Sequence, residues 1–532
     1  MHLQKPGLMR IDLKPGLMKL PDLRLAPHYM TSASEDGLNI VMAASEAVPY
    51  AKTGGLADMV GALAIDLTKS GHHVTLLMPC YRGRATGEVR RLAMQLSIPV
   101  DGKPVDVMVE EENVPVSGAV HRLRVLFVRY DPYFDRPGLY QQDHQDYPDN
   151  LERFVLFCRA VLEIVRDLIE TRAEKIDVLH LHDWQVALCA VYLKVFPHEY
   201  KGFDQLKVLL TLHNMGYQGT FSGQEFVKTG LPPSLFSPNG LEFYGSINCL
   251  KGGIIFSDAV STVSPTYAKE IMTAEYGYGL EGVLASRADG VTGITNGIDV
   301  VTWDPETDSC LPAQYTAADL SGKQICKRAL QRELGLPNRD VPVLAVIGRL
   351  TFQKGFDLLV QVIPELMYLD IQIVVLGTGD HQLEQQFIAA QARYSDRIGL
   401  CLGFDEELAH RIEAGSDMLI MPSRYEPCGL SQLYSLRYGT VPIVRRTGGL
   451  TDTVVPFQPS TVKSRCATGF HFIDASPDSL LSVLLLSLHV YKERHTWQSL
   501  ILAGMKADLS WDRSAKLYVE LYQGLRSRRK ED

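Results

Sequence analysis

Short runs of apolar residues recur along the whole chain, and most of them end at a glycine, a proline or a polar residue. Runs of this length without alternating polar positions are typical of parallel strands that are covered on both faces. Between them lie longer segments with apolar residues at helical spacing, among them 149–170. This alternation in both halves predicts an α/β protein with two Rossmann-like sheets. We expect strands at 38–44, 73–78, 122–130, 176–181, 208–212, 342–348, 371–379, 397–404, 418–421 and 440–444.

A polar stretch at 304–340 interrupts this alternation and indicates a linker that leads into a helix. We therefore expect 37–303 and 341–509 to form separate Rossmann-like domains. Residues 510–532 begin with a favourable N-cap sequence, which predicts a terminal helix.

Residues 1–36 contain the sequence KPGLM twice, and lysines and prolines interrupt each of their apolar runs. This pattern does not match a secretory signal peptide. We expect a disordered extension, with an organelle-targeting segment as the alternative.

The composition is that of an ordinary globular protein of two to three domains, with 532 residues of which 46% are hydrophobic. A net charge of −9 argues against non-specific binding to nucleic acid. The nine cysteines form no CxxC pair, which argues against a zinc site or a disulfide framework and favours a reducing compartment. No apolar run reaches the roughly 18 residues of a membrane span, and we expect a core helix at 480–490.

The stretch 417–454 combines two predicted strands with loops that suit an anionic ligand. A polar turn carrying Glu426 follows the first strand, a helical run opens at Gly429, and Thr447–Gly449 follows the second strand. Helix N-termini offer unpaired N–H groups, and glycines let the backbone approach a phosphate closely. Because a carboxylate does not bind phosphate, the expected partner of Glu426 is rich in hydroxyls. Together these features predict a sugar nucleotide.

Two further loops could contact the phosphates of such a ligand. Lys52 and Gly54–Gly55 precede a helix expected at 61–67, although a glycine pair is by itself also typical of a tight turn. Arg349 and Lys354 lie on a tight loop after strand 342–348, where an exposed basic turn is the alternative.

Two polar residues also follow predicted strands of the first half. His213 lies at the end of strand 208–212 beside a glycine-containing loop, which favours a site residue over a core residue. Asp183 follows strand 176–181, where either an N-cap or a site role is expected.

The motifs KTGGLAD (52–58), RYEPCGL (424–430) and RRTGGL (445–450) closely resemble those of bacterial glycogen synthases and plant starch synthases. Similar stretches at 213–219 and 276–284 extend the resemblance over nearly the whole chain. These enzymes are retaining glucosyltransferases of the GT-B fold. The resemblance therefore implies two Rossmann-like domains that face a deep cleft, with a C-terminal helix that crosses back to the first domain.

The same resemblance implies a donor, an acceptor and site residues. ADP-glucose is the implied donor, with UDP-glucose as the alternative, and the non-reducing end of an α-1,4-glucan such as glycogen is the implied acceptor. A bacterial cytoplasm is the expected location, with a plastid as the alternative. The implied catalytic residues are His213, Glu426, Arg349, Lys354 and Asp183. The residues implied to bind ADP-glucose are Lys52, Gly54, Gly55, Asp58, Asn214, Asn296, Arg349, Lys354, Glu426, Cys428, Gly429, Leu430, Thr447, Gly448 and Gly449.

No Asp-x-Asp pattern of the kind that anchors a metal in other glycosyltransferases occurs in the chain, so we expect catalysis without a metal or cofactor. The sequence also shows no obvious carboxylate pair of the retaining-glycosidase type. This favours the front-face route proposed for the family, in which the acceptor attacks from the side that the diphosphate leaves. In that route the carbonyl of His213 stabilises the sugar cation and Glu426 holds glucose hydroxyls.

Other interpretations stay open from the sequence. A glucan phosphorylase would share the architecture but needs a lysine that carries pyridoxal phosphate. A non-catalytic glucan-binding relative would keep the fold, whereas a dehydrogenase would need a dinucleotide fingerprint that the glycine loops lack. Cys428 could be a nucleophile, but no partner base is evident nearby, and packing is the favoured interpretation.

Overall fold

The computed structural model describes residues 37–83, 87–94, 96–100, 102–143, 145–200, 202–203 and 205–527. The extension expected at 1–36 lies outside these residues. None of the described helices is long and apolar enough to cross a membrane.

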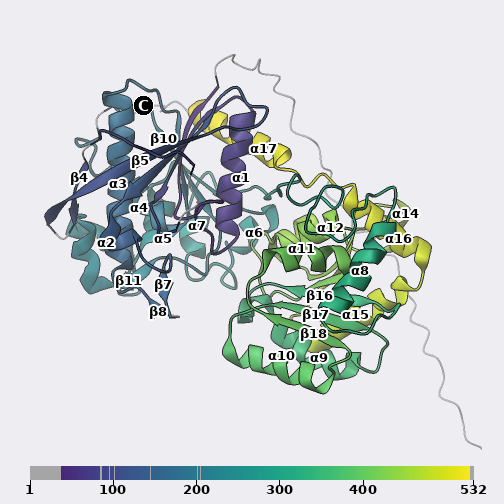
Figure 1. Ribbon diagram of the computed structural model, residues 1–532. Helices are drawn as coiled ribbons and strands as arrows, with labels where there is room; N and C mark the ends of the chain where they lie inside the picture. The colour runs from purple at the N-terminus through teal and green to yellow at the C-terminus, as the bar shows by residue number, and fades with distance from the viewer. Residues whose placement is uncertain are drawn as a thin grey trace, which may run out of the picture. The chain divides into compact units, whose positions relative to one another are not determined.

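Two large sheets organise the described chain (Figure 1), and we call each sheet with the helices packed on it a lobe. In the first sheet the strand order is β15-β14-β10-β9-β1-β2-β6-β5-β3. All neighbours from β15 to β6 are parallel, and β5 and β3 add an antiparallel edge. Its strands are β1 (Asn39–Ala43), β2 (His73–Pro79), β3 (Arg90–Arg91), β4 (Leu96–Val100), β5 (Lys103–Val114), β6 (Leu123–Arg129), β9 (Val178–His182), β10 (Lys207–Leu212), β14 (Ala259–Thr262) and β15 (Thr292–Gly293). Of these, β4 lies off the strand order given above and pairs with β5.

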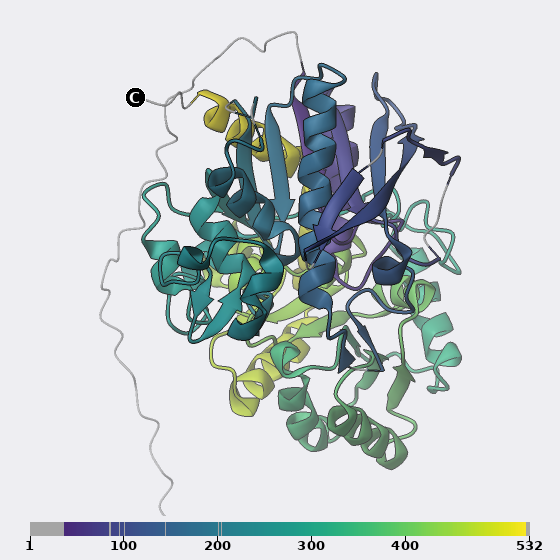
Figure 2. The same ribbon diagram turned by 90° about the vertical axis from the view of Figure 1, so that its left-hand side faces the viewer.

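Helices cover both faces of the first sheet. In the two ribbon views α3 and α4 lie on one side of the strands, and α1 and α17 lie on the other (Figure 1, Figure 2). The main helices of this lobe are α1 (Gly55–Lys69), α3 (Asn150–Glu170), α4 (Trp184–Val195), α5 (Cys249–Phe256), α6 (Pro265–Glu270), α7 (Glu281–Ala285) and α17 (Trp511–Ser527).

The second sheet is parallel throughout, in the order β18-β17-β16-β19-β20-β21. Successive residues of β16 belong to different cores: Leu344 packs in one apolar cluster, and Val343 packs in another. This double burial is the reason why the strand is a continuous apolar run. The strands are β16 (Val343–Ile347), β17 (Gln372–Gly377), β18 (Ile398–Leu402), β19 (Met418–Met421), β20 (Val441–Arg445) and β21 (Phe470–Phe472). The helices are α8 (Ser321–Glu333), α9 (Phe356–Leu366), α10 (His381–Arg393), α11 (Glu406–Gly415), α12 (Ser431–Arg437), α13 (Gly448–Thr453), α14 (Pro459–Lys463), α15 (Pro477–Tyr491) and α16 (Arg494–Met505).

The C-terminal helix α17 belongs to the core of the first lobe, as the sequence predicts. Its tyrosines Tyr518 and Tyr522 are fully buried there. The hydroxyl of Tyr522 lies 2.8 Å from Nδ1 of His180 on β9. The chain therefore returns from the second lobe and packs on the first sheet.

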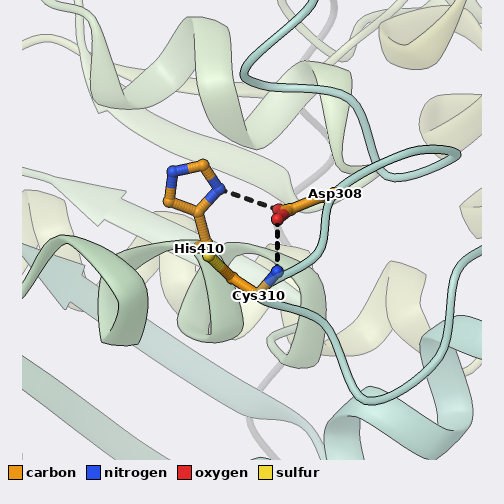
Figure 3. A group of neighbouring side chains, drawn as sticks. All are labelled: Asp308, Cys310 and His410. Carbon is orange, nitrogen blue, oxygen red and sulfur yellow. Dashed lines mark hydrogen bonds and ion pairs between the residues drawn. The ribbon is translucent and has the colours of Figure 1, made fainter.

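The predicted linker is anchored to the second lobe by a buried hydrogen-bond network (Figure 3). The Asp308 carboxylate accepts from Nδ1 of His410 at 2.8 Å, from the Tyr438 hydroxyl at 2.5 Å and from the Cys310 backbone N–H at 2.8 Å. The indole of Trp303 stacks on His410 at 3.7 Å. Asp308, Cys310 and His410 form the one group of described residues close enough to hold a metal ion, but these hydrogen bonds already account for their arrangement.

Two short helices cap one another across the lobes. Asp452 of α13 accepts from the Ser264 hydroxyl at 2.5 Å and from the Thr266 backbone N–H at 2.9 Å, at the start of α6. Glu270, at the end of α6, accepts from the Gly448 backbone N–H at 2.9 Å, at the start of α13. A carboxylate at a helix N-terminus is favoured by the orphan N–H groups and the helix dipole. This reciprocal contact joins the lobes beside the loops described next.

Candidate active site

The expected site residues follow strands that lie at, or next to, the point where the strand order of each sheet reverses. β1 lies between β2 and β9, and β16 lies between β17 and β19. Ligands of open α/β sheets bind beyond the carboxyl ends of the strands at such switch points. The loops after β1, β9 and β10 carry Lys52, Asp183 and His213, and the loops after β16 and β19 carry Lys354 and Glu426.

A partly buried ion pair forms the centre of the candidate site in the second lobe. Nζ of Lys354 donates to Oε2 of Glu426 at 2.6 Å, and the Ser423 hydroxyl donates to the same oxygen at 3.0 Å. Glu426 is only 5% exposed. Gly355 permits this turn because its φ is +68° and a Cβ there would lie 2.1 Å from the Pro422 carbonyl oxygen. The exposed basic turn considered for Lys354 is therefore wrong for this side chain, although Arg349 is exposed.

The loops of the first lobe contact this centre. A Cβ on Gly55 would lie 3.7 Å from Cδ1 of Leu430. Nη1 of Arg349 donates to the Tyr217 hydroxyl at 3.3 Å, and the rings of Tyr278 and Tyr425 meet edge to face at 5.6 Å. The structure therefore places the glycine loop of the first lobe against the loop that carries Glu426.

Lys52 and Asp58 form an ion pair of 2.8 Å at the first turn of α1. Gly54 is the N-cap of this helix, and apart from its chain neighbours no described residue has an atom within 4 Å of the place where its Cβ would be. Burial raises the pKa of Asp58, and the Lys52 ammonium opposes that shift. The N-terminus of α1 is thus open beside a cation, as a phosphate site requires.

Cys428 is buried, and burial raises the pKa of its thiol to about 12 although a backbone hydrogen bond from Asn296 opposes the shift. A neutral thiol is a poor nucleophile, so the packing interpretation is favoured. Oδ1 of the neighbouring Asn296 is buried, and no described residue forms a hydrogen bond with it. Gly429 has a φ of +76° and leads from Cys428 into α12.

The loop Thr447–Gly449 makes contacts that the sequence does not reveal. The Gly448 backbone N–H and the Thr447 hydroxyl both donate to Glu270 of the first lobe. The Gly449 backbone N–H donates to the carbonyl of Glu426. These donors, which we expected to face the ligand, here hold the lobes and the Glu426 loop together.

His213 is held from two sides by residues at the end of β9. Oδ1 of Asp183 accepts from the His213 backbone N–H at 2.7 Å, and Nδ1 of His182 lies 3.1 Å from Nε2 of His213.

Asp183 stands at the N-cap position of α4, but its side chain makes no capping hydrogen bond to that helix, so the N-cap interpretation is wrong for its side chain. Its φ of +62° is unusual for a residue other than glycine and is typical of functional sites. Oδ1 of Asn214, the residue after His213, accepts from the Gly216 backbone N–H.

Burial strongly shifts the pKa of both Asp183 and His213. It raises the pKa of Asp183 to about 7, with the His213 backbone hydrogen bond opposing the shift, and it lowers the pKa of His213 to about 3. His213 is therefore neutral near neutral pH and acts through hydrogen bonds rather than as a cation.

Asp183 gives a testable dependence of stability on pH. Its folded-state pKa lies above the ordinary value near 3.8, so folding favours the protonated acid, and this contribution is lost as the pH rises from about 4 through about 7. Compared with Asp183→Asn, the wild type should lose up to about 4 kcal/mol over this range, at 1.36 kcal/mol per pKa unit. Melting temperatures of both proteins at pH 5 and pH 8 test this, and a difference that stays constant would contradict it.

Some residues of the site were missed from the sequence. Glu46 is 3% exposed and accepts from the Thr53 hydroxyl at 2.7 Å and from the Tyr140 hydroxyl at 2.6 Å. Through Thr53, Glu46 therefore holds the loop that carries Lys52 and Gly54–Gly55. Its place just after strand 38–44 is a signal that could have identified it, because polar residues at the carboxyl end of a central strand are candidates for a site.

Two family models match the chain, one in each half. The starch synthase catalytic domain matches residues 39–286, and glycosyl transferases group 1 matches residues 327–499.

Individual proteins are similar over nearly the full length. Glycogen synthase of Koribacter versatilis is 44% identical over 91% of this chain and 98% of that protein, and glycogen synthase of an Anaeromyxobacter species is 45% identical over 92% and 99%. Among solved structures, the catalytic domain of starch synthase IV from Arabidopsis thaliana, bound to ADP and acarbose, superimposes with a TM-score of 0.84. It is 36% identical and covers 93% of this chain and 100% of that one. The chain therefore belongs to the glycogen synthase and starch synthase family of glycosyltransferases, and its two Rossmann-like lobes form the GT-B fold.

Proposed function

We propose that this enzyme transfers glucose from ADP-glucose to the non-reducing end of an α-1,4-glucan and retains the anomeric configuration. The observation that carries the proposal is the Lys354–Glu426 ion pair at the switch point of the second sheet. A cation suits a diphosphate and a carboxylate suits sugar hydroxyls, so this pair supports a sugar nucleotide as the ligand. The starch synthase IV structure, bound to ADP and acarbose, supports an adenine nucleotide and a glucan as ligands of this site.

In the proposed reaction the diphosphate leaves while the acceptor attacks from the same face. The 4-hydroxyl oxygen of the acceptor forms a bond to the anomeric carbon as the bond to the phosphate oxygen breaks, and a phosphate oxygen takes the hydroxyl proton. Arg349, Lys354 and Lys52 neutralise the charge that develops on the departing ADP, together with the open N-terminus of α1. The His213 carbonyl faces the positive charge of the sugar.

We also propose that the transfer needs no metal and no cofactor, because the proposed reaction assigns the neutralisation of the diphosphate to Arg349, Lys354 and Lys52. A bacterial cytoplasm is the proposed location. The bacterial origin of the similar glycogen synthases and the nine free cysteines support it.

A donor assay tests the function. Purified protein with glycogen should incorporate label from ADP-[¹⁴C]glucose, and incorporation should persist in EDTA. If label is incorporated mainly from UDP-[¹⁴C]glucose, the donor is UDP-glucose and not ADP-glucose. If neither compound gives incorporation, the result favours a non-catalytic relative. Loss of activity in EDTA that only a divalent ion restores would refute metal-independent transfer.

A further inference from the structure

The contact between His182 and His213 determines which nitrogen of His213 can serve the substrate. β9 and β10 are parallel neighbours, and the register places Thr211 opposite His182. His182 is fully buried, and its Nδ1 lies 3.1 Å from Nε2 of His213. With Nε2 engaged in this way, Nδ1 is the nitrogen of His213 that remains for a ligand.

Both imidazoles are neutral, because burial lowers the pKa of His182 and of His213 well below the usual range. Each neutral ring carries one N–H and one bare nitrogen. The contact therefore has two possible arrangements. Either His182 donates from Nδ1 to Nε2 of His213, or His213 donates from Nε2 to Nδ1 of His182.

The other nitrogen of His182 distinguishes these arrangements. Its Nε2 is buried and has no hydrogen-bond partner among the residues that the structure describes. If His213 were the donor, His182 would carry its proton on Nε2 and would bury an N–H without an acceptor. Orphaned buried N–H groups are rarer than orphaned acceptors. The arrangement in which His182 donates avoids such a group and leaves only a bare lone pair.

We propose that His182 is a positioning residue that fixes the proton of His213 on Nδ1, so that His213 donates a hydrogen bond to an oxygen of the transferred hexose. The recipient oxygen rests on the proposed function, but the position of the proton does not. Asp183 complements this role, because it holds the backbone of the same residue. The β9–α4 junction thus orients both the main chain and the side chain of His213.

The proton position can be measured without any substrate. In protein labelled with ¹⁵N-histidine, two-bond proton–nitrogen couplings distinguish the tautomers, and His213→Asn identifies the His213 signals. We expect Nδ1 of His213 to be protonated and Nε2 to be bare. The reverse pattern, or a positively charged ring at neutral pH, would overturn the proposal whether or not the protein transfers glucose.

Kinetics of two substitutions test the consequence. His182→Leu removes the donor and should lower kcat about tenfold, the effect of one lost hydrogen bond, with little change in KM for the glucan. His182→Asn can place an amide N–H near the position of Nδ1 and should restore most of kcat. Equal loss in both variants, or none in His182→Leu, would overturn the positioning role.

A matched control is the other buried histidine of β9. His180 lies 2.6 Å from the Thr211 hydroxyl and 2.8 Å from the Tyr522 hydroxyl, and no hydrogen bond joins it to His213 among the described residues. His180→Asn should lower the melting temperature but leave kcat within about twofold. A fall in kcat as large as that of His182→Leu would show that general loosening of β9 explains the kinetics, and would overturn the specific role of His182.

Discussion

Replacing Glu426 by glutamine is expected to lower kcat by about 10²–10³-fold while the protein stays folded. Glutamine has the same shape and can still accept from Ser423 and Lys354, so the turn after β19 should persist. It removes the negative charge that pairs with Lys354 and that we propose to hold the hydroxyls of the sugar. Removing one preorganised polar group from a transition-state site typically has an effect of this size. Initial rates at saturating ADP-glucose and glycogen, together with melting temperatures, measure both expectations.

The second lobe contains a matched control. Lys327 and Asp417 form another buried ion pair, of 2.7 Å, but Asp417 precedes β19, whereas Glu426 follows it. Asp417→Asn should therefore lower the melting temperature with kcat unchanged in the folded fraction. Equal kcat losses in the two variants, or near-normal turnover of Glu426→Gln, would contradict the assignment of Glu426 to the site.

Much of the fold was predictable because double burial produces continuous apolar strands. The predictions at 418–421 and 440–444 match β19 and β20 within one residue. β21 was missed because it is short and includes a polar residue, His471, in its Phe470–Phe472 sequence. The start of α1 was placed too late, since glycines at 54 and 55 do not favour a helix by themselves.

A tertiary contact holds the first half of α1 in place. A Cβ on Gly61 would lie 2.7 Å from the Val48 carbonyl oxygen, so the helix packs directly on the loop that follows β1. Packing of this kind overrides local propensity. The sequence shows the glycine but not the backbone that it contacts.

The site was predictable where it depends on the end of a strand and not where it depends on contacts between lobes. Lys354, Glu426 and His213 follow strands that the apolar pattern reveals. The bond from Gly448 to Glu270 joins residues 178 positions apart, and no local pattern links them. The buried pair formed by Lys354 and Glu426 is likewise a product of the fold, since 72 positions separate its members.

Replacing Lys354 by glutamine is expected to be the more damaging change, in both activity and stability. The substitution removes a cation from the departing diphosphate, for which we expect a loss of about 10²–10³-fold in kcat/KM. It also leaves the Glu426 carboxylate buried, with the Ser423 hydroxyl as its one remaining side-chain partner among the described residues. Removing one partner of a fully buried ion pair typically destabilises a protein by about 3–5 kcal/mol. Because the Lys354 side chain is 18% exposed, we expect a loss below that range. Melting temperatures and steady-state kinetics with ADP-glucose measure the two effects separately.

The double variant Lys354→Gln/Glu426→Gln separates these two roles of the lysine. Once Glu426 is neutral, no uncompensated charge remains, so the double variant should melt at a higher temperature than Lys354→Gln alone. Its activity should stay as low as that of the less active single variant, because the double variant still lacks the Lys354 ammonium that we propose to neutralise the departing diphosphate. Contacting residues of one ion pair should show this non-additivity in stability. Strictly additive losses of stability would mean that Lys354 and Glu426 do not depend on one another in the folded protein, and recovery of activity in the double variant would mean that Lys354 does not act on the leaving group.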